Sequence, residues 1–575
     1  MEALLQHFHE AVITETDVEQ LKKLILQLAF QGKLIRKDQN DEPVSLLFTR
    51  ILEERQRLIK EKKIKKEKPL PPISLEEMPY LLPTGWEWER IGNVVKVISG
   101  YAFKSGDFSD SDGIKSIKIT NIGVGNFVFG TTANLPKEFI HEYKEYLVFE
   151  NDILIALTRP YIKDGLKVCL CPKSYNQTLL NQRVASLRGL FSGVLNEYVF
   201  YYFNSPIVLD YVKNYSRTMN QPNLSINSLK RLPIPLPSYE TQVRVSNRIK
   251  ELFAICDSLK EEIKQKEQSS SIMNKSIFKR IEDYNNPSQI QDLQLVVENI
   301  KHFCNTKEDI ELLRKSILSL AIQGKLIKQV PTDEPVTVLL KKIKEEKEKL
   351  IKEKKIKKEK EFPQITDEEK PFELPPGWEW TRLKEVTYNL GQKKPDKKFT
   401  YIDVGLINKE KGVISEGAQT NILLPEEAPS RARKIVKKGS VIYSTVRPYL
   451  LNIAIVNQDF KHEPIVSTAF AVLNTFNGIE NKYLYYYLRS QPFIDYVEGM
   501  MVGMAYPAIN EANFYKGCLP LPPTNEQKHI VEKVDQLMIL CDQLEANIEQ
   551  SKQEADKLMQ AVLQEASSVK KEVLS

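Results

Sequence analysis

The chain contains one stretch twice, and this repeat constrains its architecture more than any other feature. Residues 21–68 read LKKLILQLAFQGKLIRKDQNDEPVSLLFTRILEERQRLIKEKKIKKEK, and residues 313–360 read LRKSILSLAIQGKLIKQVPTDEPVTVLLKKIKEEKEKLIKEKKIKKEK. The two copies align without a gap, and each runs into a Gly-Trp-Glu-Trp at the same offset (378 − 86 = 292). A repeat of this length predicts two structurally equivalent segments, each leading into a domain.

Each copy of the repeat has the pattern of two helices joined by a turn. In the first copy Gly32 is expected to end the first helix, and Asp41-Glu42-Pro43 to open the second. The Lys-rich tail at residues 60–68 is interpreted as a solvated helix end, with a phosphate-facing arm as the alternative. The apolar positions at helical spacing are Val18, Leu21, Leu24, Ile25 and Leu28 in the first helix, then Val44, Leu47, Ile51 and Leu58 in the second.

A different pattern follows each repeat. Between residues 86 and 232, and again between 378 and 519, apolar and polar residues alternate in short runs separated by Gly, Asn and Asp. This pattern predicts short strands and turns, hence two strand-rich domains. One aromatic-rich helix is expected in each, at residues 198–212 and 483–496, and each domain ends in a Pro-rich segment.

A long helix is expected after each strand-rich domain. Its apolar positions follow spacings of 4, 3, 4, 3 and 4, which is typical of a coiled-coil seam. The two seams stand 285 residues apart (541 − 256 = 285), so Cys256 and Cys541 are expected at core positions. Met273 and Ile277 are expected to rejoin the first seam. The seam positions are Val245, Ile249, Leu252, Cys256, Leu259 and Ile263, and Ile530, Val534, Leu537, Cys541, Leu544 and Ile548.

Composition excludes several classes of protein. At 575 residues, 42% hydrophobic and 27% charged, the chain is expected to form several soluble domains. The net charge of +6 permits a polyanionic partner without requiring one. Six cysteines without a CxxC pair favour a reducing cytoplasm, and Cys169 and Cys171 are expected on one face of a strand. No apolar run is long enough to predict a membrane span or a signal peptide.

Two function classes compete for a chain built this way. The first is a binding module that presents two different recognition domains to one ligand, for which duplex DNA is suited. The second is an enzyme with duplicated catalytic domains. No Pro-Pro follows Asn, Asp or Ser as an amino-methyltransferase motif requires, no Walker loop is present, and the six histidines offer no metal pair in a helical register. The sequence therefore predicts a chain without catalytic or metal residues.

Several of these stretches resemble the specificity (S) subunit of type I restriction–modification systems. They are AFQGKLIRKDQNDEPVSLL, LPTGWEW, QPNLS, LPIPLP and ETQ in the first half, and AIQGKLIKQVPTDEPVTVLL, LPPGWEW and LPLPPTNEQKHIV in the second. One departure is Glu240-Thr241-Gln242, where the second copy has Asn525-Glu526-Gln527. The resemblance implies an α+β protein with two strand-rich target-recognition domains, joined by long antiparallel coiled-coil helices in an internal pseudo-twofold repeat.

The resemblance also implies a domain plan and a set of partners. The expected regions are 1–84 (helical), 85–237 (first recognition domain), 238–376 (central helical region), 377–522 (second recognition domain) and 523–575 (last coiled-coil helix). The implied partners are duplex DNA with a bipartite asymmetric site, two modification subunits that methylate adenine N6, and up to two restriction subunits. S-adenosylmethionine, ATP and Mg²⁺ are expected on those subunits and no cofactor on this chain. The alternative is a DNA-targeting subunit of a methyltransferase-only or other defence assembly.

Candidate DNA-contacting residues fall into two groups. Both halves contain Arg-Pro-Tyr, and features shared by both halves cannot specify different half-sites, so these residues are expected to hold phosphate or the local fold. Base reading is expected in stretches that the halves do not share, where Asn and Gln suit adenine and Arg suits guanine. The shared candidates are Arg159, Tyr161, Arg447 and Tyr449; the unshared ones are Lys104, Lys163, Arg183, Arg217, Asn220, Gln221, Asn223, Lys393, Lys394, Arg431, Arg433, Tyr506 and Asn510.

Overall fold

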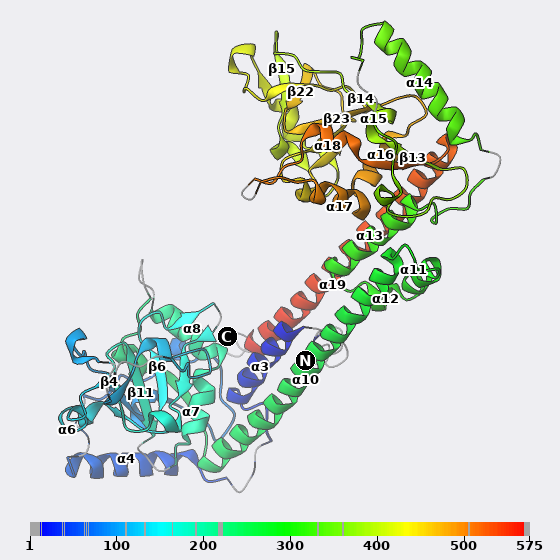
Figure 1. The fold of residues 1–575 in the computed structure, drawn as a ribbon. Coiled ribbons are helices and arrows are strands. Elements are labelled where there is room, and N and C mark those ends of the chain that lie inside the picture. The colour runs from blue at the N-terminus through cyan, green and yellow to red at the C-terminus, as the bar shows by residue number, and fades with distance from the viewer. Residues whose placement is uncertain are drawn as a thin grey trace. The chain divides into compact units, whose positions relative to one another are not determined.

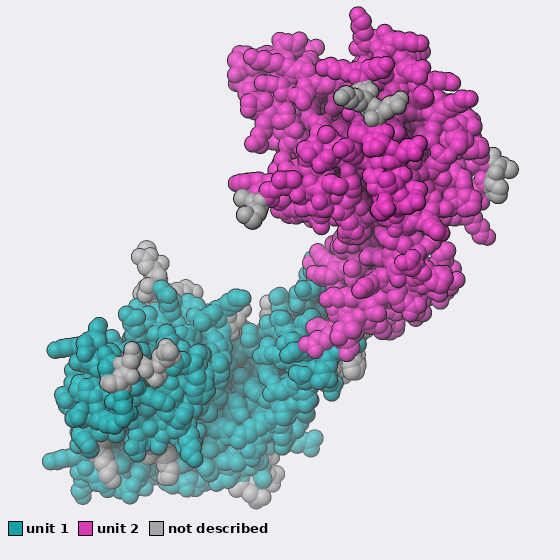
Figure 2. Space-filling view, viewed as in Figure 1, with its two compact units in different colours: residues 1–266, 552–575 teal, residues 267–551 magenta. Residues whose placement is uncertain are grey.

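The chain forms two compact units in the computed structural model. The first unit comprises residues 1–266 and 552–575, and the second comprises residues 267–551 (Figure 2). Each unit holds one strand-rich domain and a frame of helices (Figure 1), which confirms the α+β class and the duplication. The structure describes residues 14–36, 41–62, 68–109, 112–130, 134–163, 165–189, 193–216, 222–330, 333–358, 362–503 and 506–568, and residues 12, 38, 64 and 66.

The helical frame of the first unit is built on α3 (Glu15–Phe30), α4 (Val44–Lys60) and the first part of α10 (Tyr239–Glu282). α3 and α10 run antiparallel, because Lys22 Nζ lies 2.5 Å from Asp257 and Lys260 Nζ lies 2.8 Å from Glu19. Near the end of α19 (Thr524–Ser568), Leu558 packs against the same core. The first and last helical segments of the chain therefore share one core, as the repeat predicted.

The second unit repeats this frame with α13 (Lys307–Ile322), α14 (Val336–Lys352) and the first part of α19. Arg314 is 2.6 Å from Asp542, and Lys307 is 3.8 Å from Glu549, so α13 and α19 are also antiparallel. The end of α10 joins this core through the buried Asn274, which donates to Asp309 at 2.9 Å. Two further helices complete the frame, α11 (Gln289–Glu298) and α12 (Ile300–Phe303).

The helical pattern read from the sequence is confirmed at most positions. The seam residues of each long helix join the core of their own unit, where they pack against the helices of the repeat. Val44, Leu47, Ile51 and Leu58 are all buried, so the stripe on α4 is covered within the first unit rather than left for a partner subunit. Ile277 is buried as expected, but the expectation for Met273 was wrong: Met273 is 46% exposed, and Asn274 and Phe278 face the core instead.

The strand-rich domain of the first unit contains two four-stranded sheets. One has the order β2-β11-β6-β9 and is antiparallel, and the other has the order β4-β3-β10-β5 with β3 and β10 parallel. Its elements are β1 (Glu87–Arg90), α5 (Ile91–Val94), β2 (Val95–Ser99), β3 (Ile114–Ile117), β4 (Asn134–Leu135), α6 (Phe139–Glu142), β5 (Leu147–Val148), β6 (Ile153–Ala156), β7 (Tyr161–Ile162), β8 (Gly165–Leu166), β9 (Val168–Leu170), β10 (Thr178–Leu180), β11 (Val184–Gly189), α7 (Asn196–Phe203), α8 (Pro206–Tyr215), α9 (Ile226–Arg231) and β12 (Pro233–Leu236).

The domain of the second unit has the same two sheets in the same connection order. They are β14-β23-β20-β21 and β18-β15-β22-β19, with β15 and β22 parallel. Its elements are β13 (Glu379–Arg382), α15 (Leu383–Val386), β14 (Thr387–Tyr388), β15 (Phe399–Ile402), β16 (Ile407–Asn408), β17 (Val413–Ile414), β18 (Ile422–Leu423), β19 (Ala432–Ile435), β20 (Val441–Ser444), β21 (Ile453–Ile455), β22 (Glu463–Ser467), β23 (Phe470–Thr475), α16 (Asn481–Leu488), α17 (Gln491–Gly499), α18 (Glu511–Lys516) and β24 (Cys518–Leu521).

The entry and exit of each domain are paired as a short antiparallel ribbon. In the first domain β1 pairs with the Pro-rich β12, with Trp88 opposite Pro235. Tyr198 and Tyr202 of α7 donate their hydroxyls to the carbonyls of Pro235 and Pro233, at 2.7 and 2.6 Å. The aromatic helix is therefore part of the core, as expected, because its buried hydroxyls satisfy carbonyls of the exit strand.

The single aromatic helix expected in each domain is two helices. α7 ends at Phe203 and α8 begins at Pro206, with Ser205 as its N-cap; in the second domain α16 and α17 break in the same way at Ser490. A Ser before a Pro in the first turn is a helix-start signal, and it outweighs the continuous apolar pattern on either side.

The cysteines have the packing role expected of them. All six are buried and unpaired, and Cys169 and Cys171 lie in the same core cluster. Burial raises the pKa of the Cys169 thiol to about 12. Among the described residues, no helix is both long and apolar enough to cross a membrane.

Candidate nucleic-acid interface

The two Arg-Pro-Tyr motifs form equivalent loops, one in each domain. Arg159 follows β6 and donates its backbone N–H to the carbonyl of Pro222 at 2.8 Å, and Arg447 follows β20 and donates to the carbonyl of Pro507 at 2.8 Å. Each loop thereby ties the end of a central strand to the segment that leads into a short helix, α9 or α18. We call these the Arg-Pro loops.

Both arginines adopt the same uncommon backbone conformation. Arg159 has φ +47° and Arg447 has φ +48°, in the left-handed region that residues other than Gly, Asn and Asp seldom occupy. Their side chains are exposed while the prolines that follow are buried. The backbone is therefore fixed by the fold and each guanidinium is presented to solvent, as a phosphate or base contact requires.

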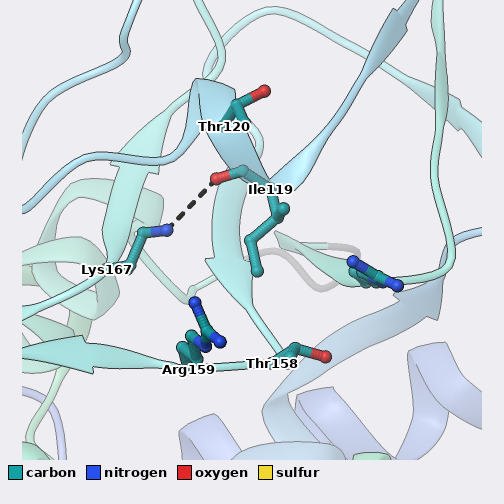
Figure 3. Close-up of a pocket in the computed structure, with 6 residues that line it drawn as sticks. Ile119, Thr120, Thr158, Arg159 and Lys167 are labelled. Atoms are coloured by element: carbon teal, nitrogen blue, oxygen red, sulfur yellow. Dashed lines mark hydrogen bonds between the residues drawn. The ribbon is translucent and has the colours of Figure 1, made fainter.

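A pocket of about 380 Å³ opens beside the Arg-Pro loop of the first unit (Figure 3). We call it the cationic pocket, because three of its side chains are cations and none is a carboxylate. In Figure 3 the side chain of Arg159 projects toward Ile119, whose carbonyl accepts a hydrogen bond from Lys167 Nζ at 3.3 Å. The residues that line it are Ile119, Thr120, Thr158, Arg159, Lys167 and Arg183.

The charge of the pocket is uncompensated within the described part of the chain. Partial burial, followed by the positive charge of Arg159, lowers the pKa of Lys167. Both effects disfavour the charged form of Lys167. A bound anion or a hydrogen-bond acceptor would stabilise the charged ammonium and offset the repulsion between Lys167 and Arg159. The pocket can therefore bind phosphate or a hydrogen-bond acceptor on a base.

The Arg-Pro loop of the second unit lies beside an aromatic surface. The Arg447 guanidinium is 4.9 Å from the centre of the Tyr506 ring, and Tyr506 is 70% exposed. Val502 and Ala508 exchange backbone hydrogen bonds at 2.9 and 3.1 Å, which places Tyr506 on a short hairpin next to the loop. The structure thus brings Tyr506 beside Arg447, two candidates that the sequence had singled out separately.

The remaining candidates of the first domain are dispersed. Lys104 is exposed between β2 and β3, and Lys163 is exposed in the turn between β7 and β8 with φ +51°. Asn223 is exposed beside the Arg-Pro loop, since its backbone bridges to Thr158. Tyr161 packs against the core, unlike the exposed Tyr449. Arg217, Asn220 and Gln221 lie outside the described residues.

Four candidates of the second domain lie along one sheet edge. Arg431 directly precedes β19 and Arg433 belongs to it. The segment that contains Lys393 and Lys394 lies alongside, since the N–H of Lys393 donates to the carbonyl of Arg433. Lys393 already pairs with Glu463 at 2.5 Å and Asp396 at 3.4 Å, and Arg433 donates to the carbonyl of Ala432. Lys394 and Arg431 are exposed.

Asn510 has a structural role that sequence reasoning missed. It is the N-cap of α18, where its Oδ1 accepts from the N–H of Asn513 at 2.8 Å. Sequence reasoning also missed Thr120, Thr158 and Lys167 in the cationic pocket. Thr158 adjoins a motif that was recognised, but Lys167 reaches the pocket only because β9 pairs with β6, a long-range contact with no local signal.

Two domains of one fold, each with an exposed Arg-Pro loop but with different surroundings, define a duplicated recognition protein. The family model described as "Type I restriction modification DNA specificity domain" matches residues 83–267 and 375–551. The chain belongs to this family, which confirms the resemblance drawn from the sequence.

Two curated relatives match over nearly the whole chain. The type I restriction enzyme EcoAI specificity subunit of Escherichia coli is 31% identical over 553 residues, covering 93% of this chain and 91% of the relative. The EcoEI specificity subunit of Escherichia coli is 27% identical over 569 residues, covering 95% and 94%. A solved HsdS subunit from Thermoanaerobacter tengcongensis aligns with 85% of this chain and 98% of its own, at 18% identity and a TM-score of 0.43.

Proposed function

We propose that this chain is the DNA-recognition subunit of a type I restriction–modification complex, in which each unit binds one half of a bipartite asymmetric site. The observation that carries the proposal is the pair of Arg-Pro loops. They share backbone conformation and hydrogen bonding, but one faces a cationic pocket and the other an aromatic surface. Two binding sites of one construction and different lining suit one ligand with two different halves.

The proposal assigns the catalytic steps to partner subunits. Two modification subunits would bring S-adenosylmethionine and methylate adenine N6, with the target base flipped out of the duplex into their pocket. Restriction subunits, up to two, would use ATP and Mg²⁺. Among the described residues of this chain, no group of three or more His, Cys, Asp or Glu side chains is placed to hold a metal ion.

The experiment that tests the proposal is genome-wide mapping of methylated adenines. The chain is co-expressed with its modification subunit in a host without other adenine methylation, and modified positions are located by sequencing. We expect one bipartite motif with two defined halves separated by an unread spacer. A folded complex that binds S-adenosylmethionine and leaves the genome unmethylated would contradict the proposal.

The Arg447→Ala variant is expected to weaken DNA binding by the assembled complex to all sequences alike. The loop geometry is shared by both units, so its guanidinium is assigned to the backbone, and its loss should reduce the slope of log K against log salt by about 1. Binding titrations over a salt series, on cognate and scrambled duplexes, measure this.

The control for this variant is Lys438→Ala. It also removes one cation from the second unit, but Lys438 pairs with Asp459 at 2.8 Å away from the loop. We expect its salt slope to match that of the wild type. A loss of preference at a single base pair in Arg447→Ala, with non-cognate binding unchanged, would contradict the backbone assignment.

A further inference from the structure

The positions that line the cationic pocket have counterparts in the second unit, and backbone hydrogen bonds define which residues correspond. The N–H of Leu157 donates to the carbonyl of Arg183 at 2.9 Å, and the N–H of Thr445 donates to that of Ala469 at 2.7 Å. Ala469 therefore stands where the first unit has Arg183.

The same comparison identifies the residue of the second unit that is equivalent to Lys167. The N–H of Ala156 donates to the carbonyl of Lys167 at 3.1 Å, and the N–H of Ser444 donates to the carbonyl of Asn452 at 3.0 Å. Asn452 therefore stands where the first unit has Lys167. Thr158 and Val446 each stand one residue before the loop arginine and bridge to the segment that precedes α9 or α18. Val446 therefore stands where the first unit has Thr158.

These substitutions separate what the units share from what distinguishes them. The arginine of each Arg-Pro loop is common to both, whereas the Lys, Arg and Thr of the first unit become Asn, Ala and Val in the second. A side chain present in both units cannot tell two different half-sites apart, so discrimination at this position falls to Lys167 and Arg183.

The chemistry of these two side chains selects one kind of base edge. Both donate hydrogen bonds and neither accepts them. In the major groove, guanine presents two acceptors, N7 and O6, and Arg or Lys on this edge is the commonest specific contact. Adenine presents a donor beside its N7, cytosine presents a donor, and thymine presents a single acceptor, O4, so guanine alone offers an acceptor to each of the two cations.

Lys167 and Arg183 both keep hydrogen-bond donors that are free to bind a ligand. Arg183 is exposed, and no described residue forms a hydrogen bond or an ion pair with its guanidinium. Lys167 is half-buried and spends one of its three donors on the carbonyl of Ile119, which holds the ammonium at the pocket and leaves two donors. The pocket thus has hydrogen-bond donors available for an acceptor pair.

We propose that Lys167 and Arg183 form a guanine-reading site in the half-site bound by the first unit, while Arg159 beside them holds the DNA backbone. This inference rests on the proposed DNA-recognition function. The second unit lacks the site, because Asn452, Ala469 and Val446 occupy its positions. Arg431 lies close to Ala469, since its carbonyl accepts from the N–H of Thr468 at 2.8 Å.

The test combines the Arg183→Ala variant with duplexes in which one guanine is replaced by an analogue. The complex of this chain with its modification subunit is titrated with duplexes carrying the mapped motif, in which single guanines are replaced by 7-deazaguanine, which lacks the N7 acceptor. We expect one guanine at which the analogue weakens binding of the wild type by roughly tenfold to a hundredfold. Arg183→Ala should weaken binding to the normal duplex similarly, and should no longer distinguish guanine from its analogue at that position.

The adenine methylation map of the Arg183→Ala complex provides a second readout. We expect the motif to relax at one G·C pair and to keep every other position. Lys173→Ala removes another exposed cation of the same domain, outside the pocket, and should leave both the motif and the response to the analogue unchanged.

Three results would overturn the guanine site. They are relaxation at an A·T pair, a loss of affinity for all sequences alike with a smaller salt slope, and an Arg183→Ala complex that still distinguishes the analogue at every guanine. Each of these leaves a sequence-specific complex, so the proposed function would stand. A wild-type complex with no motif at all would instead remove the proposed function.

Discussion

Arg90→Ala is expected to destabilise the first unit by about 3–5 kcal/mol, the range for removing one partner of a buried ion pair. The Arg90 side chain is 3% exposed and pairs with Glu77 at 2.8 Å. It also donates to the backbone carbonyls of Pro71, Pro72 and Arg231. One guanidinium thus joins the segment after the Lys-rich tail to both ends of the recognition domain, and an alanine leaves a carboxylate and three carbonyls without their donor.

The pH dependence of the free energy of unfolding distinguishes the contribution of the Arg90–Glu77 charges from that of side-chain packing. The hydrogen bonds from Arg90, the largest cause, lower the pKa of Glu77 from its ordinary 4.5 to about 2. Because the folded pKa is the lower one, the unfolded chain binds more protons between these values, and the stabilisation is present above pH 4.5 and lost as pH falls toward 2. Arg90→Ala should remove this contribution, so the two proteins should converge in stability as the pH falls through this window.

Urea unfolding between neutral pH and pH 3, with hydrogen exchange followed in peptides of residues 69–90, measures both effects. Arg57→Ala is the matched control, since Arg57 is 61% exposed in its pair with Glu54 and should change stability by less than about 0.5 kcal/mol. The counterpart Arg382→Ala should cost less than Arg90→Ala, because Glu369 is more exposed and Arg382 Nε has no hydrogen-bond partner among the described residues. Equal effects of Arg90→Ala and Arg57→Ala would contradict the prediction.

The frame of this molecule could be predicted from the sequence because its signals are local and occur twice. Gly32 ends α3 with φ +68°, and Pro43 precedes the first residue of α4, as the turn between the two helices required. The long helix begins directly after the Pro-rich exit of the domain. Periodic apolar positions identify helices of this length well, and a repeated copy confirms each assignment.

The recognition surface could be predicted only in part, because it is assembled by strand pairing. The Arg-Pro loops were found through their repetition. Lys167 was not, since nothing in its neighbourhood distinguishes it from an ordinary lysine on a strand, and only the pairing of β6 with β9 brings it beside Arg159. Repetition in the sequence identifies the residues that the two units share. The residues that differ can be matched between the units only through equivalent backbone hydrogen bonds, which the sequence does not show.

A buried lysine on β19 shows the same limit of prediction from the sequence. The sequence singled out Arg431 and Arg433, but the inward-facing cation is Lys434, because alternate residues of β19 face opposite sides. Its side chain is 3% exposed, and its ammonium donates to Glu511 at 2.9 Å and to the carbonyl of Phe470 at 2.5 Å. Asn389 holds the other oxygen of Glu511 at 3.2 Å.

Glu511→Ala is therefore expected to destabilise the second unit far more than Lys434→Met. Removing Glu511 leaves an ammonium buried with one carbonyl, at the lower end of about 3–5 kcal/mol because Glu511 itself is 36% exposed. Methionine at 434 fills the same space without a charge and leaves Glu511 in contact with solvent and Asn389, so its cost should be limited to the lost donor of the Phe470 carbonyl, about 1 kcal/mol. The double variant should recover most of the stability lost in Glu511→Ala. Thermal unfolding of the three variants would contradict this account if Lys434→Met were the more damaging change, since the pair would then stabilise the fold through its attraction rather than merely compensate a buried charge.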